Sequence, residues 1–131
     1  MPPSARPLSP HLQVYRRQIQ MVTSILHRAT GVILVVGSIL VAAALVALAS
    51  GPDAWSCVTD LSGTWYGQVF LIGWTWTLAF HWLNGIRHLL QDAGLGFSIA
   101  RFVSHSWISV IGSLLLVAIV WAIAFSRGGV A

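Results

Sequence analysis

Residues 32–50 read VILVVGSILVAAALVALAS, a run with no Asp, Glu, Lys or Arg. The charge-free interval extends over residues 29–52, from Arg28 to Asp53. A helix needs about 20 mostly apolar residues to cross the hydrocarbon core of a bilayer. This stretch therefore predicts a transmembrane helix, and the sequence Ser50-Gly51-Pro52 marks its end because glycine followed by proline stops helices.

Two further charge-free intervals follow at residues 61–86 and 102–126. A soluble three-helix core is the competing interpretation, but its helices would show a polar face at a period of 3.6 residues. The first and third intervals show almost no such face. We therefore expect an all-α integral membrane protein, one anchor domain over residues 1–131, with three transmembrane helices at about residues 23–50, 64–91 and 104–126.

The composition agrees with a membrane protein. Of the 131 residues, 56% are hydrophobic and 8% are charged, whereas soluble domains carry about 25% charged residues. The net charge of +4 does not indicate nucleic-acid binding, because the arginines flank the apolar runs instead of forming one basic face. The single cysteine, Cys57, excludes both an intrachain disulfide and a metal site built from cysteines.

The arginines also predict the orientation in the membrane. Four of them precede the first charge-free interval, two lie near the connection between the second and third, and only Arg127 follows the third. Cytoplasmic segments carry the excess of basic residues. We therefore expect the N-terminus in the cytoplasm, the C-terminus outside, and residues 1–22 as a proline-rich cytoplasmic arm.

A first group of polar residues lies at the start of the first helix. Ser24, His27, Arg28 and Gly31 follow one another at spacings that place them on one helical face. Ionisable residues inside a membrane are costly and usually face a bundle interior or a cofactor. The alternative is that His27 and Arg28 reach the lipid headgroups and only anchor the helix.

A second group recurs along one stripe of the second helix: Trp74, Thr77, His81, Asn84, Gly85 and His88. His81 lies about 10 Å deeper than His88 at 1.5 Å rise per residue. An imidazole at that depth either forms a hydrogen bond in helix packing or binds iron. Gly85 favours an iron ligand, because a missing side chain one turn away lets a flat macrocycle approach. His88 then lies where haem propionates would need a partner.

Three segments carry a family resemblance: RPLSPHLQVY at residues 6–15, SILHRATG at 24–31 and HWLNGIRHLLQDAG at 81–94. The chain resembles the cytochrome b556 subunits of succinate dehydrogenase over nearly its whole length. The resemblance implies a b-type haem whose iron has His81 as one axial ligand. It implies propionate contacts by His27, Arg28 and His88 in a haem environment that includes Gly85, and a quinone pocket lined by Ser24 and Arg28.

The resemblance also implies partners. A second small membrane subunit would supply the other axial histidine, completing a heteromeric transmembrane bundle, and an iron–sulfur subunit and a flavoprotein subunit would oxidise succinate. The chain itself would be a non-catalytic anchor that passes electrons to a quinone, expected to be ubiquinone. The expected location is the bacterial cytoplasmic membrane, with the mitochondrial inner membrane as the alternative. Competing functions are the anchor of a fumarate reductase, a haem-free scaffold or assembly protein, and a small ion pathway.

Overall fold

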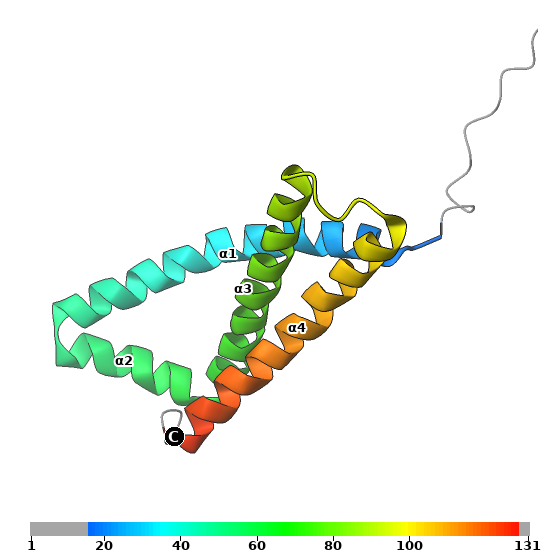
Figure 1. The fold of residues 1–131 in the computed structure, drawn as a ribbon. Helices are drawn as coiled ribbons and strands as arrows, with labels where there is room; N and C mark the ends of the chain where they lie inside the picture. Colours follow the sequence, from blue (N-terminus) through cyan, green and yellow to red (C-terminus); the bar gives the residue numbers. More distant parts are fainter. Residues whose placement is uncertain (1–15, 129–131) are drawn as a thin grey trace, which may run out of the picture.

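The computed structural model describes residues 16–128, which form four α-helices (Figure 1). They are α1 (Ile19–Ser50), α2 (Pro52–Gly63), α3 (Trp65–Asp92) and α4 (Ile99–Ser126). The turn between α1 and α2 lies at Gly51, whose φ of 122° is open to glycine because it has no Cβ. Pro52 opens α2, where its missing N–H costs no hydrogen bond. The predicted all-α fold class is confirmed.

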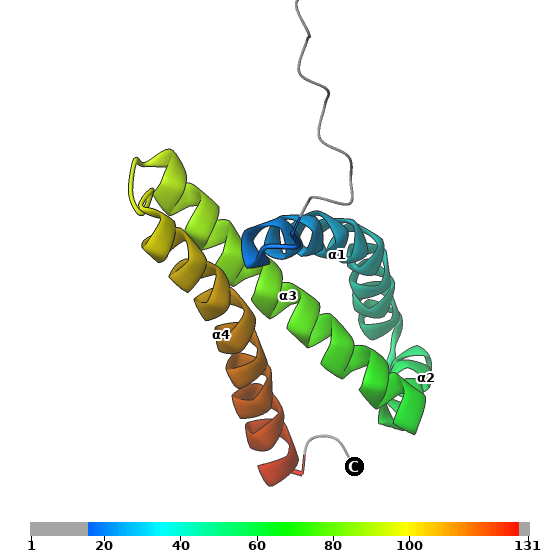
Figure 2. The same cartoon turned by 90° about the vertical axis from the view of Figure 1, so that its right-hand side faces the viewer.

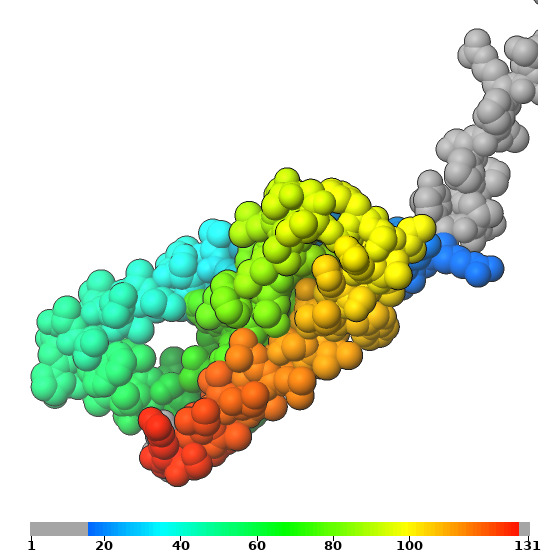
Figure 3. Space-filling view, viewed as in Figure 1, coloured from blue at the N-terminus to red at the C-terminus, as the bar shows by residue number. Residues whose placement is uncertain are grey.

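The four helices are arranged as one close pair with a crossing helix. α3 and α4 run antiparallel and side by side in both ribbon views (Figures 1 and 2). α1 crosses α3 with its N-terminal part and then diverges, and α2 leads back to the start of α3. Figure 3 shows an opening between these helices. The start of α1, the end of α3 and the start of α4 thus lie at the same end of the molecule (Figure 1).

The distribution of polar and apolar side chains is the reverse of that in a soluble domain. Among residues 16–128, the buried apolar side chains are Ala79, Phe80 and Val117. The buried polar side chains are more numerous: Thr23, Thr30, Thr77, Asn84, Arg87, Ser106, Ser109 and Ser113. Lipid tails are as apolar as leucine, so packed membrane helices place small and polar residues between them and leave apolar ones outside.

Two helices, α1 and α4, are long and apolar enough to cross a membrane. Only 6% of the most apolar part of α1 is buried, whereas the core helix of a soluble protein would be mostly covered. α3 has 28 residues and is long enough at 1.5 Å per residue, but its polar stripe makes it less apolar than the other two.

Two helices in the structure extend beyond the predicted transmembrane spans. α1 begins at Ile19, so residues 19–22 of the predicted arm are helical; residues 1–15 lie outside the described part of the chain. α4 begins at Ile99, after Ser98, ahead of the span predicted from about residue 104. The reason is that charged residues such as Arg101 limit the apolar part of a helix, whereas the helix itself continues beyond the hydrocarbon.

A further helix, which was not predicted, connects the first two predicted spans. Residues 52–63 form α2, where the sequence indicated only the end of a helix. Proline followed by Asp53 in the first turn is a good helix start, because the carboxylate is stabilised by the positive end of the helix dipole. The C-terminal end of α2 leads directly into the cap of α3, where the Thr64 hydroxyl accepts a hydrogen bond from the Gly67 amide.

Candidate functional site

Three imidazole rings meet where α1 crosses α3. The rings of His27 and His81 stack with centroids 3.9 Å apart and an interplanar angle of 12°. The ring of His88 lies 5.1 Å from that of His27, tilted by 46°. His81 and His88 share one face of α3 because seven residues are about two helical turns. The structure therefore brings together the three histidines that the two sequence motifs singled out.

The ring of His81 is held through Nδ1. This atom lies 3.1 Å from the backbone oxygen of His27 and 3.1 Å from the hydroxyl oxygen of Thr30. A carbonyl oxygen can only accept, so Nδ1 donates its hydrogen and Nε2 keeps a free lone pair. Imidazole ligands of metals are usually fixed in this way, by a hydrogen bond from the ring nitrogen that does not bind the metal.

Gly31 makes room for the His81 ring against α1. A methyl group at Gly31 would lie 3.1 Å from Cε1 of His81, whereas one at Gly85 would make an ordinary contact of 3.8 Å with Cε1 of His27. Within this chain the close approach of α1 and α3 therefore depends on Gly31. The part that Gly85 plays toward a macrocycle stays a prediction.

The residues of the first motif differ in exposure. Ser24 is half-buried and Arg28 is exposed. Among residues 16–128, Arg28 forms no hydrogen bond or ion pair. The other hydroxyl groups of α1, those of Thr23, Thr30, Ser38 and Ser50, donate to backbone carbonyls one turn earlier, whereas that of Ser24 has no such partner. Both side chains can therefore bind a group outside the chain.

Arg87 is a buried cation that was not among the predicted site residues, although it lies in the motif at residues 81–94. Its side chain is 4% exposed. Nη1 donates to Oδ1 of Asn84 at 3.1 Å and to the Thr23 hydroxyl at 3.4 Å, and the guanidinium carbon lies 4.6 Å from the centre of the Phe102 ring. Arg87 thus joins α1, α3 and α4. The spacing of Asn84 and Arg87, three residues apart, was the signal available in the sequence.

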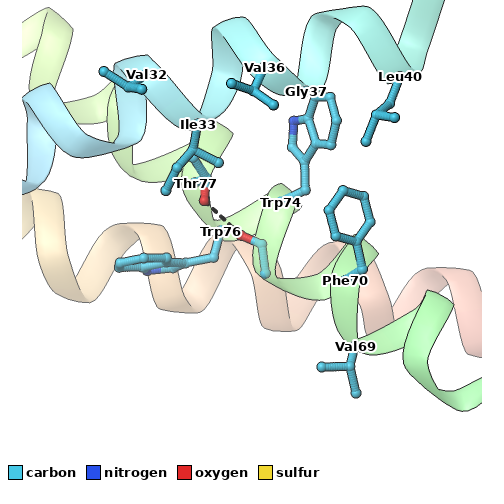
Figure 4. Close-up of a pocket in the computed structure, with 11 residues that line it drawn as sticks. Val32, Ile33, Val36, Gly37, Leu40, Val69, Phe70, Trp74, Trp76 and Thr77 are labelled. Carbon is cyan, nitrogen blue, oxygen red and sulfur yellow. Dashed lines mark hydrogen bonds between the residues drawn. The ribbon is translucent and has the colours of Figure 1, made fainter. Parts of the chain in front are cut away.

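A groove of about 500 Å³ lies between α1 and α3 (Figure 4). Its lining is almost wholly apolar: Val32, Ile33, Val36, Gly37, Leu40, Val69, Phe70, Gly73, Trp74, Trp76 and Thr77. The Trp74 indole lies against Gly37, because a methyl group in place of this glycine would overlap the ring unless the ring moved. No charged side chain and no histidine lines the groove, so its apolar surface differs in chemistry from the imidazole cluster.

The donor set fits a haem better than a free metal ion. Within residues 16–128, no three His, Cys, Asp or Glu side chains are arranged to hold a metal ion. A single imidazole with a free Nε2 suits an iron that a macrocycle already coordinates. Nδ1 of His27 is buried and has no partner among the described residues, which leaves a polar atom beside His81 for a group from outside the chain.

The chain is similar to known membrane subunits of respiratory enzymes. Residues 2–121 match the family described as succinate dehydrogenase/fumarate reductase transmembrane subunit. The succinate dehydrogenase cytochrome b556 subunit of Paracoccus denitrificans is 41% identical over 92% of each chain, and that of Rickettsia prowazekii is 38% identical over 88% of this chain and 90% of its own. The mitochondrial cytochrome b560 subunit of Sus scrofa is 34% identical over 86% of this chain and 68% of its own.

Proposed function

The chain belongs to the family of succinate dehydrogenase/fumarate reductase transmembrane subunits, and we propose that it is the haem b-carrying membrane anchor of a succinate:quinone oxidoreductase. The relatives named above are cytochrome subunits of succinate dehydrogenase. Their names support succinate oxidation and a haem. The single observation that carries the proposal is the geometry of His81, whose Nδ1 is occupied by backbone and hydroxyl oxygens and whose Nε2 is free.

His81 would hold the haem iron as an axial ligand, and the second axial histidine would come from another small membrane subunit. Haem supplies one-electron oxidation and reduction when it is bound. His27, Arg28 and His88 would hold its propionates. The exposed guanidinium of Arg28 and the unpartnered Nδ1 of His27 support this assignment, since carboxylates are bound best by charged or hydrogen-bonding groups. Gly85 would leave space for the macrocycle.

Ser24 and Arg28 would bind the quinone, expected to be ubiquinone. They are four positions apart in the sequence, so they lie on one side of α1. The Ser24 hydroxyl has no backbone partner in the described part of the chain, so it can donate to a quinone carbonyl oxygen. The fixed charge of Arg28 attracts a reduced, negatively charged quinone more strongly than a neutral one, so it would favour reduction itself and not only binding.

The proposed topology has three transmembrane helices, α1, α3 and α4, with α2 on the external side. The N-terminus would be cytoplasmic and the C-terminus external, so that Ser24, Arg28 and His88 face the cytoplasm. An iron–sulfur subunit, itself reduced by a flavoprotein subunit, would dock at this end and deliver electrons to the quinone. The bacterial relatives support a location in the bacterial cytoplasmic membrane.

The family description also names fumarate reductase, so the reverse reaction is the second candidate. The names of the similar proteins favour succinate oxidation. Measured rates of succinate oxidation and fumarate reduction by the purified complex decide between the two directions.

The test of the haem proposal is a reduced-minus-oxidised optical spectrum of the complex purified from membranes. The unaltered complex should show a b-type band, and His81→Leu should abolish or displace it. His88→Leu should keep the haem, although its potential changes. His105→Leu is the matched control, because His105 lies at the start of α4 and packs against Gly96. A normal low-spin spectrum in His81→Leu would disprove the assignment, and a complex without haem would revive the scaffold interpretation.

A further inference from the structure

The hydrogen-bond pattern around Thr30 determines which nitrogen of His81 carries hydrogen. The Thr30 hydroxyl lies 2.8 Å from the backbone oxygen of Leu26 and 3.0 Å from that of His27. These oxygens can only accept, so the single hydroxyl hydrogen points toward one of them. The hydroxyl therefore presents a lone pair to Nδ1 of His81, 3.1 Å away. Nδ1–H then has two acceptors, this hydroxyl and the His27 carbonyl.

Thr30 is also well placed to resist movement of the ring. Its side chain is 2% exposed, and its hydroxyl is tied to the helix backbone, so the acceptor cannot follow a rotating imidazole. On the next residue, a methyl group at Gly31 would already be 3.1 Å from Cε1 of His81, so the backbone of α1 closes off the same edge of the ring. The imidazole is thus held along its Nδ1–Cε1 edge, with Nε2 as the free nitrogen.

We infer that Thr30 is a positioning residue for the axial ligand: its hydroxyl holds His81 in the tautomer and orientation that present Nε2 to the haem iron. This inference rests on the proposed function of His81. Thr30 itself touches neither iron nor quinone. Because an acceptor at Nδ1–H makes the imidazole a stronger electron donor, the hydroxyl also stabilises the oxidised iron and lowers the reduction potential.

The test compares Thr30→Val, which keeps the shape and removes the hydroxyl, with Thr30→Ser, which keeps the hydroxyl. Both complexes are purified intact, their haem content is measured, and the b-type band is titrated against potential. Thr30→Val should shift the reduction equilibrium about fivefold toward the reduced haem, the size expected for one neutral hydrogen bond. For a one-electron couple this is about +40 mV, at 59 mV per tenfold. Thr30→Ser should match the unaltered complex.

The outcomes separate this inference from the function on which it rests. An unchanged potential and haem content in Thr30→Val overturns the role of Thr30 and leaves His81 as ligand. Equal shifts in Thr30→Val and Thr30→Ser also overturn it, because the methyl group and not the hydroxyl would then be responsible. Loss of haem from assembled Thr30→Val but not from Thr30→Ser supports it. The proposed function is tested separately by His81→Leu, in which a normal haem spectrum would disprove that His81 binds the iron.

Discussion

Replacing Arg28 by leucine should slow quinone reduction without harming the assembly of the complex. The side chain is exposed and forms no hydrogen bond or ion pair among residues 16–128, so its removal leaves no buried group of these residues unsatisfied. The loss of Arg28 should therefore weaken the binding of its ligand and leave the packing of the helices unchanged. Residues that snorkel to the lipid headgroups behave differently, since their loss affects insertion and assembly.

The size of the effect follows from the kind of bond that is lost. Hydrogen bonds to charged groups contribute about 1.5–3 kcal/mol, and each 1.36 kcal/mol is tenfold in rate. Because Arg28 is exposed, water screens it, and the lower end of this range applies. We expect kcat/KM for quinone to fall about tenfold in Arg28→Leu. Ser24→Ala loses a neutral hydrogen bond of about 1 kcal/mol, which corresponds to about fivefold.

The assay measures two activities of the same membranes and divides each by the amount of assembled complex. Quinone reduction by succinate passes through the proposed site, whereas an artificial dye takes electrons before they reach the quinone. Arg28→Leu and Ser24→Ala should lower the first activity and largely keep the second. Arg16→Leu is the control, because Arg16 is an exposed arginine outside the motif. The reasoning is refuted if both activities fall in parallel, or if Arg28→Leu reduces quinone at the normal rate.

Two further predictions concern the helices themselves. For topology, an alkaline phosphatase fusion at the C-terminus should be active and one after Arg101 inactive, because only external fusions fold; the opposite pattern would invert the proposed orientation. For the buried cation, Arg87→Met should lower the thermal stability of the complex, and a double-mutant cycle with Asn84→Leu should give a coupling of about 1 kcal/mol, as for hydrogen bonds between membrane residues. Strictly additive effects would show that the 3.1 Å bond contributes nothing.

The sequence by itself was enough to identify the class of protein. An apolar run such as residues 32–50 indicates that a helix is surrounded by lipid, because a helix needs about 20 apolar residues in a row to cross a bilayer. The motifs around Arg28 and His81 were specific enough to indicate the family, which the comparisons confirm. Apolar runs and motifs are formed by residues that are close together in the sequence, so they can be recognised without the structure.

Helix boundaries were less accessible to the sequence. Residues 52–63 form a helix that was not predicted, because a glycine–proline pair ends one helix and can begin another at the same point. Charge, which limits the apolar part of a helix, does not limit the helix, so α4 starts at Ile99 before Arg101. The predicted spans describe the apolar part of each helix, and the helices in the structure extend past that part.

Only the tertiary structure decided which polar residues meet. Thr30 and His81 lie 51 positions apart in the sequence, and Thr23 and Arg87 lie 64 apart, so no local periodicity connects them. Their contacts depend on the angle and closeness at which α1 crosses α3, and Gly31 and Gly37 control that approach because a side chain at either would meet the opposite helix. The sequence determined that polar groups had to be satisfied inside the bundle; the crossing of the helices determined their partners, because hydrogen bonds form only between groups that packing brings within about 3 Å.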